Sequence, residues 1–403
     1  MRFKKAGKDM FCLNNNIYIV NGKRRACIYD LNHSDLYSIP LELASVLQDI
    51  SSYGELPDSL LKTSTFQTLL QQGILVRAEE EKLPLISCSA PKIELATFEI
   101  TQKCNFRCIH CFEKDKSYKD VPLETARIVI DELVSEGISN IHLFGGEPFA
   151  HPYFCEILEY CKGKFRKIHI TTNASLLDKR ILASLTDPQI MVLASLHSDL
   201  PQSFDRVTGT KNQLAVVQNN ISLMKEAGVN VQVRKVKITG IWSTDHYENY
   251  HGDMSGYPIM IGNANIHQYS RDMLRTKAVT ESCFTTKLDV ENVLRNMEYQ
   301  ACFSKNIYID VNLDVYPCIM ERRKKHGTLG RKPLKDVISD SIRGVTKDEI
   351  ERCRDCEYRY ACNTCFVDTR SDFFYACPWF CLYEPEKGTW KDVDSWIDEV
   401  LDS

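Results

Sequence analysis

In the first 90 residues, hydrophobic positions first follow the spacing of β-strands and then the spacing of helices. Two β-prone runs flank Asn21-Gly22, and Asn-Gly between such runs predicts a hairpin, because both residues tolerate positive φ. Together with the helical stretches, this hairpin predicts a winged-helix-like unit over residues 1–90. Its predicted elements are a hairpin at residues 17–29, helices at 40–50 and 58–72, and a closing strand at 74–76.

From residue 93 to about 264, short apolar runs alternate with amphipathic helical stretches. Such alternation predicts an α/β fold with a parallel sheet and right-handed crossovers. About six βα units suit an open or partial barrel, which we place at residues 91–275, and ligands gather at the carboxyl ends of such strands. The predicted strands are 93–100, 141–144, 167–171, 190–196, 229–238 and 258–261, and the predicted helices are 122–136, 153–161, 176–185 and 214–227.

Composition narrows the class of protein. The 403 residues are 43% hydrophobic and 26% charged, which is typical of a soluble globular protein and excludes a disordered or fibrous chain. The net charge of −4 gives no overall electrostatic footprint for nucleic acid or an anionic membrane. The apolar runs are far shorter than the roughly 20 residues that a bilayer needs. No apolar segment follows the basic N-terminus as in a signal peptide, so we expect a cytoplasmic protein.

The chain has 17 cysteines, and in a reducing compartment clustered cysteines are more often metal or redox ligands than disulfides. Cys104, Cys108 and Cys111 form a Cys-x3-Cys-x2-Cys loop directly after the first predicted barrel strand. Three thiolates can hold three irons of a [4Fe–4S] cube and leave the fourth iron open. A zinc loop is the alternative, but structural zinc takes four ligands, and His110 lies within the same tight loop.

This loop, with Phe112 after its third cysteine, resembles the signature of radical S-adenosylmethionine (SAM) enzymes. The resemblance implies that SAM chelates the open iron and is cleaved reductively to a 5′-deoxyadenosyl radical that abstracts hydrogen. Gly145-Gly146-Glu147-Pro148, after the second strand, looks like the GGEP motif of that family, which binds the amino group of SAM. By the same resemblance, Asn173, Ser195 and Arg206 are expected to face the cofactor, although a turn Asn or a solvated Arg explains each as well alone.

A second group of cysteines lies in the irregular C-terminal part, residues 276–403. Pairs at x2 spacing commonly form zinc ribbons, so zinc is a serious alternative here. The region resembles a SPASM domain, the auxiliary-cluster domain of radical enzymes that modify peptides and proteins. It departs from that pattern at Leu313, where a glycine is expected, and in its last spacing, which is x2 and not x3. The cysteines are Cys302, Cys318, Cys353, Cys356, Cys362, Cys365, Cys377 and Cys381.

The SPASM resemblance implies two auxiliary [4Fe–4S] clusters. Auxiliary cluster I would take Cys302, Cys318 and Cys365, and its fourth ligand would be Cys283 or a substrate thiolate. Auxiliary cluster II would take Cys353, Cys356, Cys362 and Cys381. We prefer Cys381 to Cys377, because the residues after Cys381 resemble the closing motif of these maturases. The remaining cysteines are predicted to be buried small hydrophobes: Cys12, Cys27, Cys88, Cys155, Cys161 and Cys377.

Taken together, the modules resemble maturases of ribosomally made peptides, closest to the grasp-with-SPASM or thioether-forming groups. The N-terminal unit would then bind the leader of a precursor peptide by strand addition. A structural cap is the main alternative, while DNA binding is disfavoured because residues 1–77 lack a basic recognition helix. The resemblance further implies a reducing partner such as flavodoxin or ferredoxin.

The reaction expected from this resemblance is hydrogen abstraction, then bond formation and oxidation through the auxiliary clusters. A thioether from a substrate Cys to carbon is the first choice, followed by a carbon–carbon cross-link or epimerisation, and then by an anaerobic sulfatase-type maturase. An iron–sulfur electron carrier is the non-enzyme alternative, and it would not produce 5′-deoxyadenosine. No spacing singles out a catalytic base among the polar candidates Glu321, Asp314 and His267.

Overall fold

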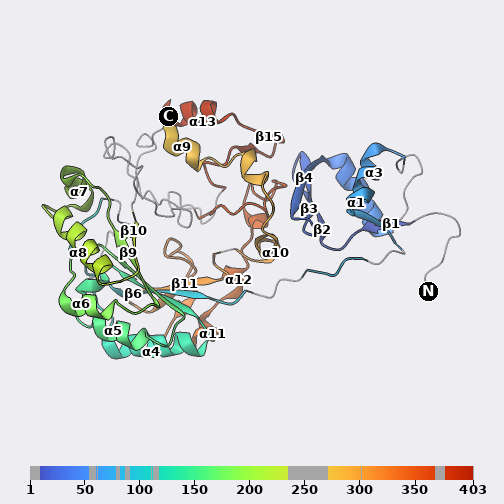
Figure 1. Cartoon of the computed structure of the whole chain (residues 1–403). Helices are drawn as coiled ribbons and strands as arrows, with labels where there is room; N and C mark the ends of the chain where they lie inside the picture. Colours follow the sequence, from blue (N-terminus) through green and yellow to red (C-terminus); the bar gives the residue numbers. More distant parts are fainter. Residues whose placement is uncertain are drawn as a thin grey trace.

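Three parts of the chain are visible in the computed structural model (Figure 1): an N-terminal unit, a parallel sheet covered by helices, and a cysteine-rich C-terminal part. None of the described helices is long and apolar enough to cross a membrane. The structure describes residues 10–53, 60, 62–78, 82–86, 91–109, 111, 118–234, 271–300, 302–367 and 377–402.

One eight-stranded sheet forms the centre of the molecule, in the order β10-β9-β8-β7-β6-β11-β12-β13. Strands β6 to β10 pair in parallel, which confirms the predicted α/β partial barrel, and the predicted strand at 258–261 lies outside the described residues. The strands are β6 (Leu95–Thr101), β7 (Asn140–Gly145), β8 (Lys167–Thr172), β9 (Ile190–Ser195), β10 (Val231–Arg234), β11 (Asn306–Ile309), β12 (Asp314–Tyr316) and β13 (Gly327–Thr328).

The C-terminal part contributes strands to this same sheet. β11 pairs in parallel with the free edge of β6, and β12 and β13 follow in antiparallel order. The register aligns Ile309 with Phe98, so β11 lies directly beside the strand that leads into the first cysteine loop. The predicted domain boundaries at 90 and 275 stay predictions, because the sheet runs across the second of them.

Helices cover one face of the parallel strands (Figure 1). Successive strand residues point to opposite faces, so alternate residues of each strand pack against these helices. Ile141 and Leu143 join the apolar core with the helices, whereas His142 between them does not. The helices are α4 (Leu123–Ser135), η1 (Pro148–Ala150), α5 (Phe154–Cys161), α6 (Lys179–Ser184), α7 (Pro201–Thr208) and α8 (Leu214–Glu226). Helix α7 was not predicted. It is short, begins with Pro201 and buries Phe204 and Val207.

The N-terminal unit is a three-stranded antiparallel sheet, β2-β3-β4, with helices and a small second sheet in which β1 pairs with β5. The predicted hairpin is confirmed as β2-β3, while β1 and β4 were not predicted. The helix predicted at 40–50 begins one residue later, because Pro40 is the last residue of β4. The elements are β1 (Phe11–Leu13), β2 (Ile17–Asn21), β3 (Arg25–Asp30), β4 (Asp35–Pro40), α1 (Leu41–Tyr53), α3 (Ser64–Gln71) and β5 (Leu75–Arg77).

The β2-β3 turn rests on the C-terminal part of the chain. Lys23 N donates to Asp355 O at 2.8 Å, and the buried Tyr29 hydroxyl donates to Glu357 O at 2.9 Å. A Cβ on Gly22 would lie 2.8 Å from Glu357 N and 2.9 Å from Asp355 O. The glycine is therefore required by this close approach and not by a positive φ, which corrects the reason given by the hairpin pattern.

The C-terminal part has short elements and several separate apolar clusters. One cluster joins Cys27 and Tyr29 of β3 to Tyr358 and Tyr383, so the N-terminal unit packs on this part (Figure 1). The elements are α9 (Arg271–Lys277), η4 (Glu281–Phe284), α10 (Val290–Glu298), α11 (Leu334–Val337), α12 (Asp340–Arg343), η5 (Lys347–Glu349), β14 (Tyr383–Glu384), β15 (Thr389–Trp390) and α13 (Val393–Asp402).

Candidate functional site

The first cysteine loop follows β6 at the carboxyl end of the sheet. Cys104 and Cys108 pack against the barrel core, and all three thiols of the loop are partly exposed. Between them, Phe106 is buried and contacts Phe204 of α7 edge-on, with ring centroids 6.1 Å apart. The loop is therefore held by its own aromatic residue, while its three cysteines are only half-buried. His110 and Phe112 lie outside the described residues.

The end of α7 fixes the same loop through backbone contacts. Arg107 N donates to Thr208 O at 2.8 Å, and Ile109 N donates to Val207 O at 2.9 Å. Gly209 ends the helix with φ 64°, where a side chain would be strained, and its Cβ would lie 2.8 Å from Arg107 O. The short helix that the sequence pattern missed is thus a structural support of the cysteine loop.

The glycine pair after β7 lies against the backbone that leads to Cys104. Gly146 N donates to Thr101 O at 2.8 Å, and Glu147 N donates to Lys103 O at 2.7 Å. A Cβ on Gly145 would lie 2.2 Å from Thr101 O, and one on Gly146 would lie 2.4 Å from Lys103 O. Both glycines are needed for this close approach, and the partner observed here is protein backbone. Binding of an amino group by this stretch stays a prediction.

The Glu147 side chain turns into the protein and is fully buried. Its Oε1 accepts from Thr172 Oγ1 at 2.6 Å and Phe149 N at 3.0 Å, and its Oε2 accepts from Asn173 N at 2.6 Å. Burial raises the pKa of Glu147 to about 7, although these three donors oppose the shift. Glu147 therefore joins the turn after β7 to the end of β8, and Pro148 begins η1 directly after it.

Asn173, at the end of β8, lies beside the cysteine loop. Its Nδ2 donates to Asn105 Oδ1 at 2.9 Å and is 4.0 Å from Cys104 Sγ. Ser175 closes a small network, because its hydroxyl donates to Asn173 Oδ1 at 2.6 Å and accepts from Asn105 Nδ2 at 2.7 Å. The sequence analysis missed Asn105, Thr172 and Ser175. The position of Asn105 beside Cys104 in the motif was the available signal.

For Ser195 and Arg206 the structure shows no hydrogen bond to the cysteine loop among the described residues. Ser195 ends β9, half-buried and in register with Arg234 of β10. Arg206 is exposed in the last turn of α7, and it has no hydrogen-bond partner among the described residues. Its guanidinium is therefore available to a carboxylate, which it can bind through two parallel hydrogen bonds.

Cys302, Cys318 and Cys365 come together from three separate segments of the C-terminal part. Burial, together with the nearby Cys365 and Cys302 thiols, raises the pKa of Cys318 to about 11. Cys283 is exposed, and its neighbour Phe284 lines the pocket of the other cysteine set. The structure thus groups the three cysteines predicted for auxiliary cluster I but does not bring Cys283 to them.

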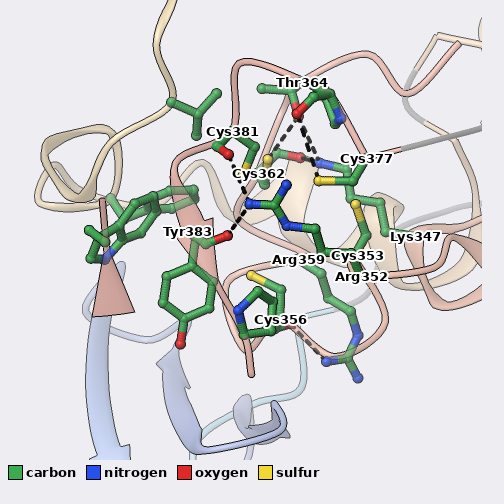
Figure 2. A pocket seen from close by; sticks show the side chains of 15 residues that line it. Lys347, Arg352, Cys353, Cys356, Arg359, Cys362, Thr364, Cys377, Cys381 and Tyr383 are labelled. Atoms are coloured by element: carbon green, nitrogen blue, oxygen red, sulfur yellow. Dashed lines mark hydrogen bonds between the residues drawn. The ribbon is translucent and has the colours of Figure 1, made fainter. Parts of the chain in front are cut away.

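The cysteines predicted for auxiliary cluster II line one pocket (Figure 2). A side-chain hydrogen bond to Cys353 and burial raise the pKa of Cys377 to about 12, while a contact with Cys381 lowers it. Cys377 therefore belongs to this pocket, which corrects its assignment as an isolated buried hydrophobe. By contrast, Cys27, Cys155 and Cys161 are buried as predicted, whereas Cys12 is only half-buried. Cys88 lies outside the described residues. The pocket cysteines are Cys353, Cys356, Cys362, Cys377 and Cys381.

The all-thiol donor sets fit iron–sulfur clusters, which proteins hold by Cys thiolates. Zinc also accepts such ligands, so thiol chemistry alone leaves that alternative open. Across the described ranges, no three His, Cys, Asp or Glu side chains form a ready site for a single metal ion.

Two of the polar residues considered as catalytic bases are engaged by other groups. Glu321 is fully buried, and Arg323 donates to its Oε2 at 2.7 Å. Asp314 Oδ1 accepts from Lys325 Nζ at 3.1 Å and from the Thr328 hydroxyl. His267 lies outside the described residues. Neither engaged carboxylate is singled out as a base by these contacts.

A partial parallel barrel thus carries a three-cysteine loop after its first strand and a glycine turn after its second. Residues 98–246 match the family described as the Radical SAM superfamily.

Among curated proteins, the antilisterial bacteriocin subtilosin biosynthesis protein AlbA of Bacillus subtilis is 34% identical over 142 residues, which cover 34% of this chain and 32% of AlbA. The PqqA peptide cyclase of Bradyrhizobium diazoefficiens is 28% identical over 118 residues, 28% of this chain and 31% of the cyclase. The matched segments thus span about a third of the length of these relatives.

Among solved structures, SuiB of Streptococcus suis bound to its precursor peptide SuiA matches 93% of this chain and 100% of SuiB, with a TM-score of 0.54 and 14% identity. A tagged form of anSMEcpe with bound AdoMet matches 77% of this chain and 93% of that protein, with a TM-score of 0.52 and 14% identity. At these identities, the likeness shows a shared fold, which in the case of SuiB extends over nearly the whole chain.

Proposed function

We propose that this protein is a radical SAM enzyme that modifies a ribosomally made precursor peptide. The observation that carries the proposal is the meeting of the cysteine loop, the Gly145-Gly146 turn and Asn173 at the carboxyl ends of β6, β7 and β8. The likeness to a bacteriocin biosynthesis protein and to a fold solved with a precursor peptide supports a peptide substrate.

Cys104, Cys108 and Cys111 would hold the radical [4Fe–4S] cluster. SAM bound at that cluster supplies, after reductive cleavage, the 5′-deoxyadenosyl radical that abstracts hydrogen. The chain's own residues bind and orient the cofactor. Backbone groups of Gly145 and Gly146 lie at the end of β7 for the amino group, and the unpartnered Arg206 offers a guanidinium to the carboxylate. Asn173 and Ser195 would contact the rest of the cofactor, with Phe112 nearby in sequence.

The two C-terminal cysteine groups would hold auxiliary [4Fe–4S] clusters. Cys302, Cys318 and Cys365 would supply three ligands of cluster I, and a substrate thiolate or Cys283 would supply the fourth. A thiol bound there would become the sulfur of a Cys-to-carbon thioether. The pocket in Figure 2 supplies cluster II, with either Cys377 or Cys381 beside Cys353, Cys356 and Cys362.

The N-terminal unit would bind the leader of the precursor. Its strand β4 is an edge that pairs with no strand other than β3 in the described part of the chain. An extended peptide can add to such an edge through main-chain hydrogen bonds, while neighbouring side chains select its register. A flavodoxin or ferredoxin is the proposed electron donor, and no nucleic acid or membrane takes part.

The first experiment counts iron, sulfide and zinc after strictly anaerobic reconstitution and then measures 5′-deoxyadenosine under reductant. Three cubes hold about twelve irons, so that count with cofactor cleavage supports the proposal. About four irons with one or two zincs would keep the radical site but remove the auxiliary clusters. A loaded protein that produces no 5′-deoxyadenosine would instead be an electron carrier.

A second assay tests the product. Candidate precursors are the short Cys-containing reading frames beside the gene. A thioether removes two hydrogens and protects the substrate Cys from alkylation. A carbon–carbon link removes two hydrogens but leaves the thiol reactive, and epimerisation changes neither mass nor thiol.

A further inference from the structure

A buried lysine lies between the two C-terminal cysteine groups. Lys347 is only 7% exposed, although lysine ammonium groups are rarely buried without a partner. It begins η5, which is fixed by a capping box between Thr346 and Glu349. This cap orders the backbone at the lysine, so its side chain enters the C-terminal part from a defined point.

The ammonium group of Lys347 reaches the Cys362 segment of the cluster II pocket (Figure 2). Its Nζ donates to Cys362 O and lies 3.5 Å from Thr364 Oγ1, and Thr364 Oγ1 lies 3.0 Å from Cys362 Sγ. An ammonium can only donate, so the Thr364 oxygen accepts from Lys347. Either atom can donate in the Thr364–Cys362 contact, but a Cys362 thiolate bound to a cluster has no hydrogen, so there the Thr364 hydroxyl would be the donor. Thr364 thus connects the charge of Lys347 to Cys362 Sγ.

No carboxylate neutralises this charge in the part of the chain that the structure describes. Lys347 forms no ion pair there, and the residues that line the pocket include no Asp or Glu. The neighbouring Arg359, in contrast, is paired with Asp348 at 2.6 Å. Lys347 also lies near Cys365 of the other cysteine group.

We propose that Lys347, acting through the Thr364 hydroxyl, raises the reduction potential of the cluster held at Cys362. The proposal rests on the proposed assignment of auxiliary cluster II. A reduced cluster carries one more negative charge than an oxidised one, and a buried ammonium stabilises that added charge strongly where the dielectric constant is low. Hydrogen bonds to the coordinating sulfurs act in the same direction. Lys347 is therefore a tuning residue that makes cluster II a stronger electron acceptor than it would be without this charge.

The test is a redox titration of the reconstituted full-length holoenzyme. The EPR signal of the reduced clusters monitors the titration. Lys347→Met removes the charge and keeps a similar side-chain length, and Thr364→Val removes only the hydroxyl. We expect Lys347→Met to move one midpoint negative by a tenfold change in electron affinity, which is about 59 mV for one electron. Thr364→Val should move the same midpoint in the same direction by less. Lys347→Arg should leave it close to wild type.

The matched control is Lys391→Met, which removes a lysine of the same part of the chain whose side chain pairs with Glu399 at 2.9 Å at the surface. It should not move any midpoint. Unchanged midpoints in both Lys347→Met and Thr364→Val, at full iron content, would overturn the inference and leave the proposed function intact. If the Lys347→Met protein contains four fewer irons than wild type, its midpoints cannot be compared. The midpoint of Thr364→Val then tests the inference alone. A wild-type protein with about four irons would overturn the auxiliary clusters and this inference together.

Discussion

Replacement of Gly146 by Ala tests whether the glycine turn positions the cysteine loop. The new Cβ would lie 2.4 Å from Lys103 O, and two further backbone atoms of the Gln102–Lys103 segment would lie at 2.7 Å. Ordinary contacts begin at 3.4 Å. Because these neighbours are backbone atoms, no flexible side chain can move aside, and the segment before Cys104 must retreat by about 1 Å.

This displacement has two calculable effects. Overpacking of a well-packed region lowers the free energy of unfolding by about 1–3 kcal/mol. A shift of about 1 Å in the group that holds a reactant lowers the rate by roughly 10²-fold. We therefore expect a folded Gly146→Ala protein whose 5′-deoxyadenosine production falls about 100-fold, with the auxiliary irons retained.

The assay measures 5′-deoxyadenosine under reductant, with iron content and denaturant unfolding as companions. Gly344→Ala is the control, because its Cβ would meet only Asp340 O, at 3.1 Å, and Glu298 O, at an ordinary 3.8 Å, at the end of a helix far from the cysteine loop in sequence. It should keep normal activity. Wild-type 5′-deoxyadenosine production by Gly146→Ala would refute the argument that close backbone approach positions the loop.

Three further predictions concern other parts of the molecule. Cys108→Ala should lose about four irons and all 5′-deoxyadenosine formation, since two thiolates of the loop should not retain the cube, and retained turnover would contradict the radical assignment. Tyr29→Phe leaves the buried Glu357 carbonyl without its 2.9 Å hydrogen bond and should lower the unfolding free energy by about 1–3 kcal/mol; an unchanged denaturation midpoint would disprove this. The folded pKa of Glu147, about 7, lies above its ordinary 4.5, so the unfolding free energy should fall as pH rises from about 4.5 to 7. Glu147→Gln should flatten that slope, and an equal slope in both proteins would count against the buried carboxyl.

The barrel could be predicted from the sequence because its signals lie within short continuous segments. Strand and helix periodicities lie within single elements, and the cysteine and glycine motifs are continuous in sequence. Elements that depend on distant pairing were missed. β4 has only one buried residue, Ile39, and its register is set by β3. The pairing of β11 with β6 joins segments about 200 residues apart.

The roles of single residues were harder to predict than the site itself. Gly22 stands in a sequence typical of a hairpin, yet its need for glycine comes from residues 355–357. Glu147 belongs to a cofactor motif, but its carboxylate is occupied by Thr172 and the backbone of Asn173 at the end of β8. Cys377 was set aside because the residues after Cys381 resemble a closing motif, whereas the fold places both among the pocket cysteines. Each outcome depends on tertiary contacts that a linear pattern does not contain.

The docking of the N-terminal sheet has a consequence for synthesis on the ribosome. The apolar face of β3 around Cys27 and Tyr29 is covered by residues that are translated some 328 positions later. At the usual elongation rate of about 5–20 residues per second, this face waits roughly 15–65 s for its partner. During that interval the nascent chain exposes an apolar strand face that can associate with other chains. We therefore expect the yield of folded protein in cells to depend on holdase chaperones and on translation speed.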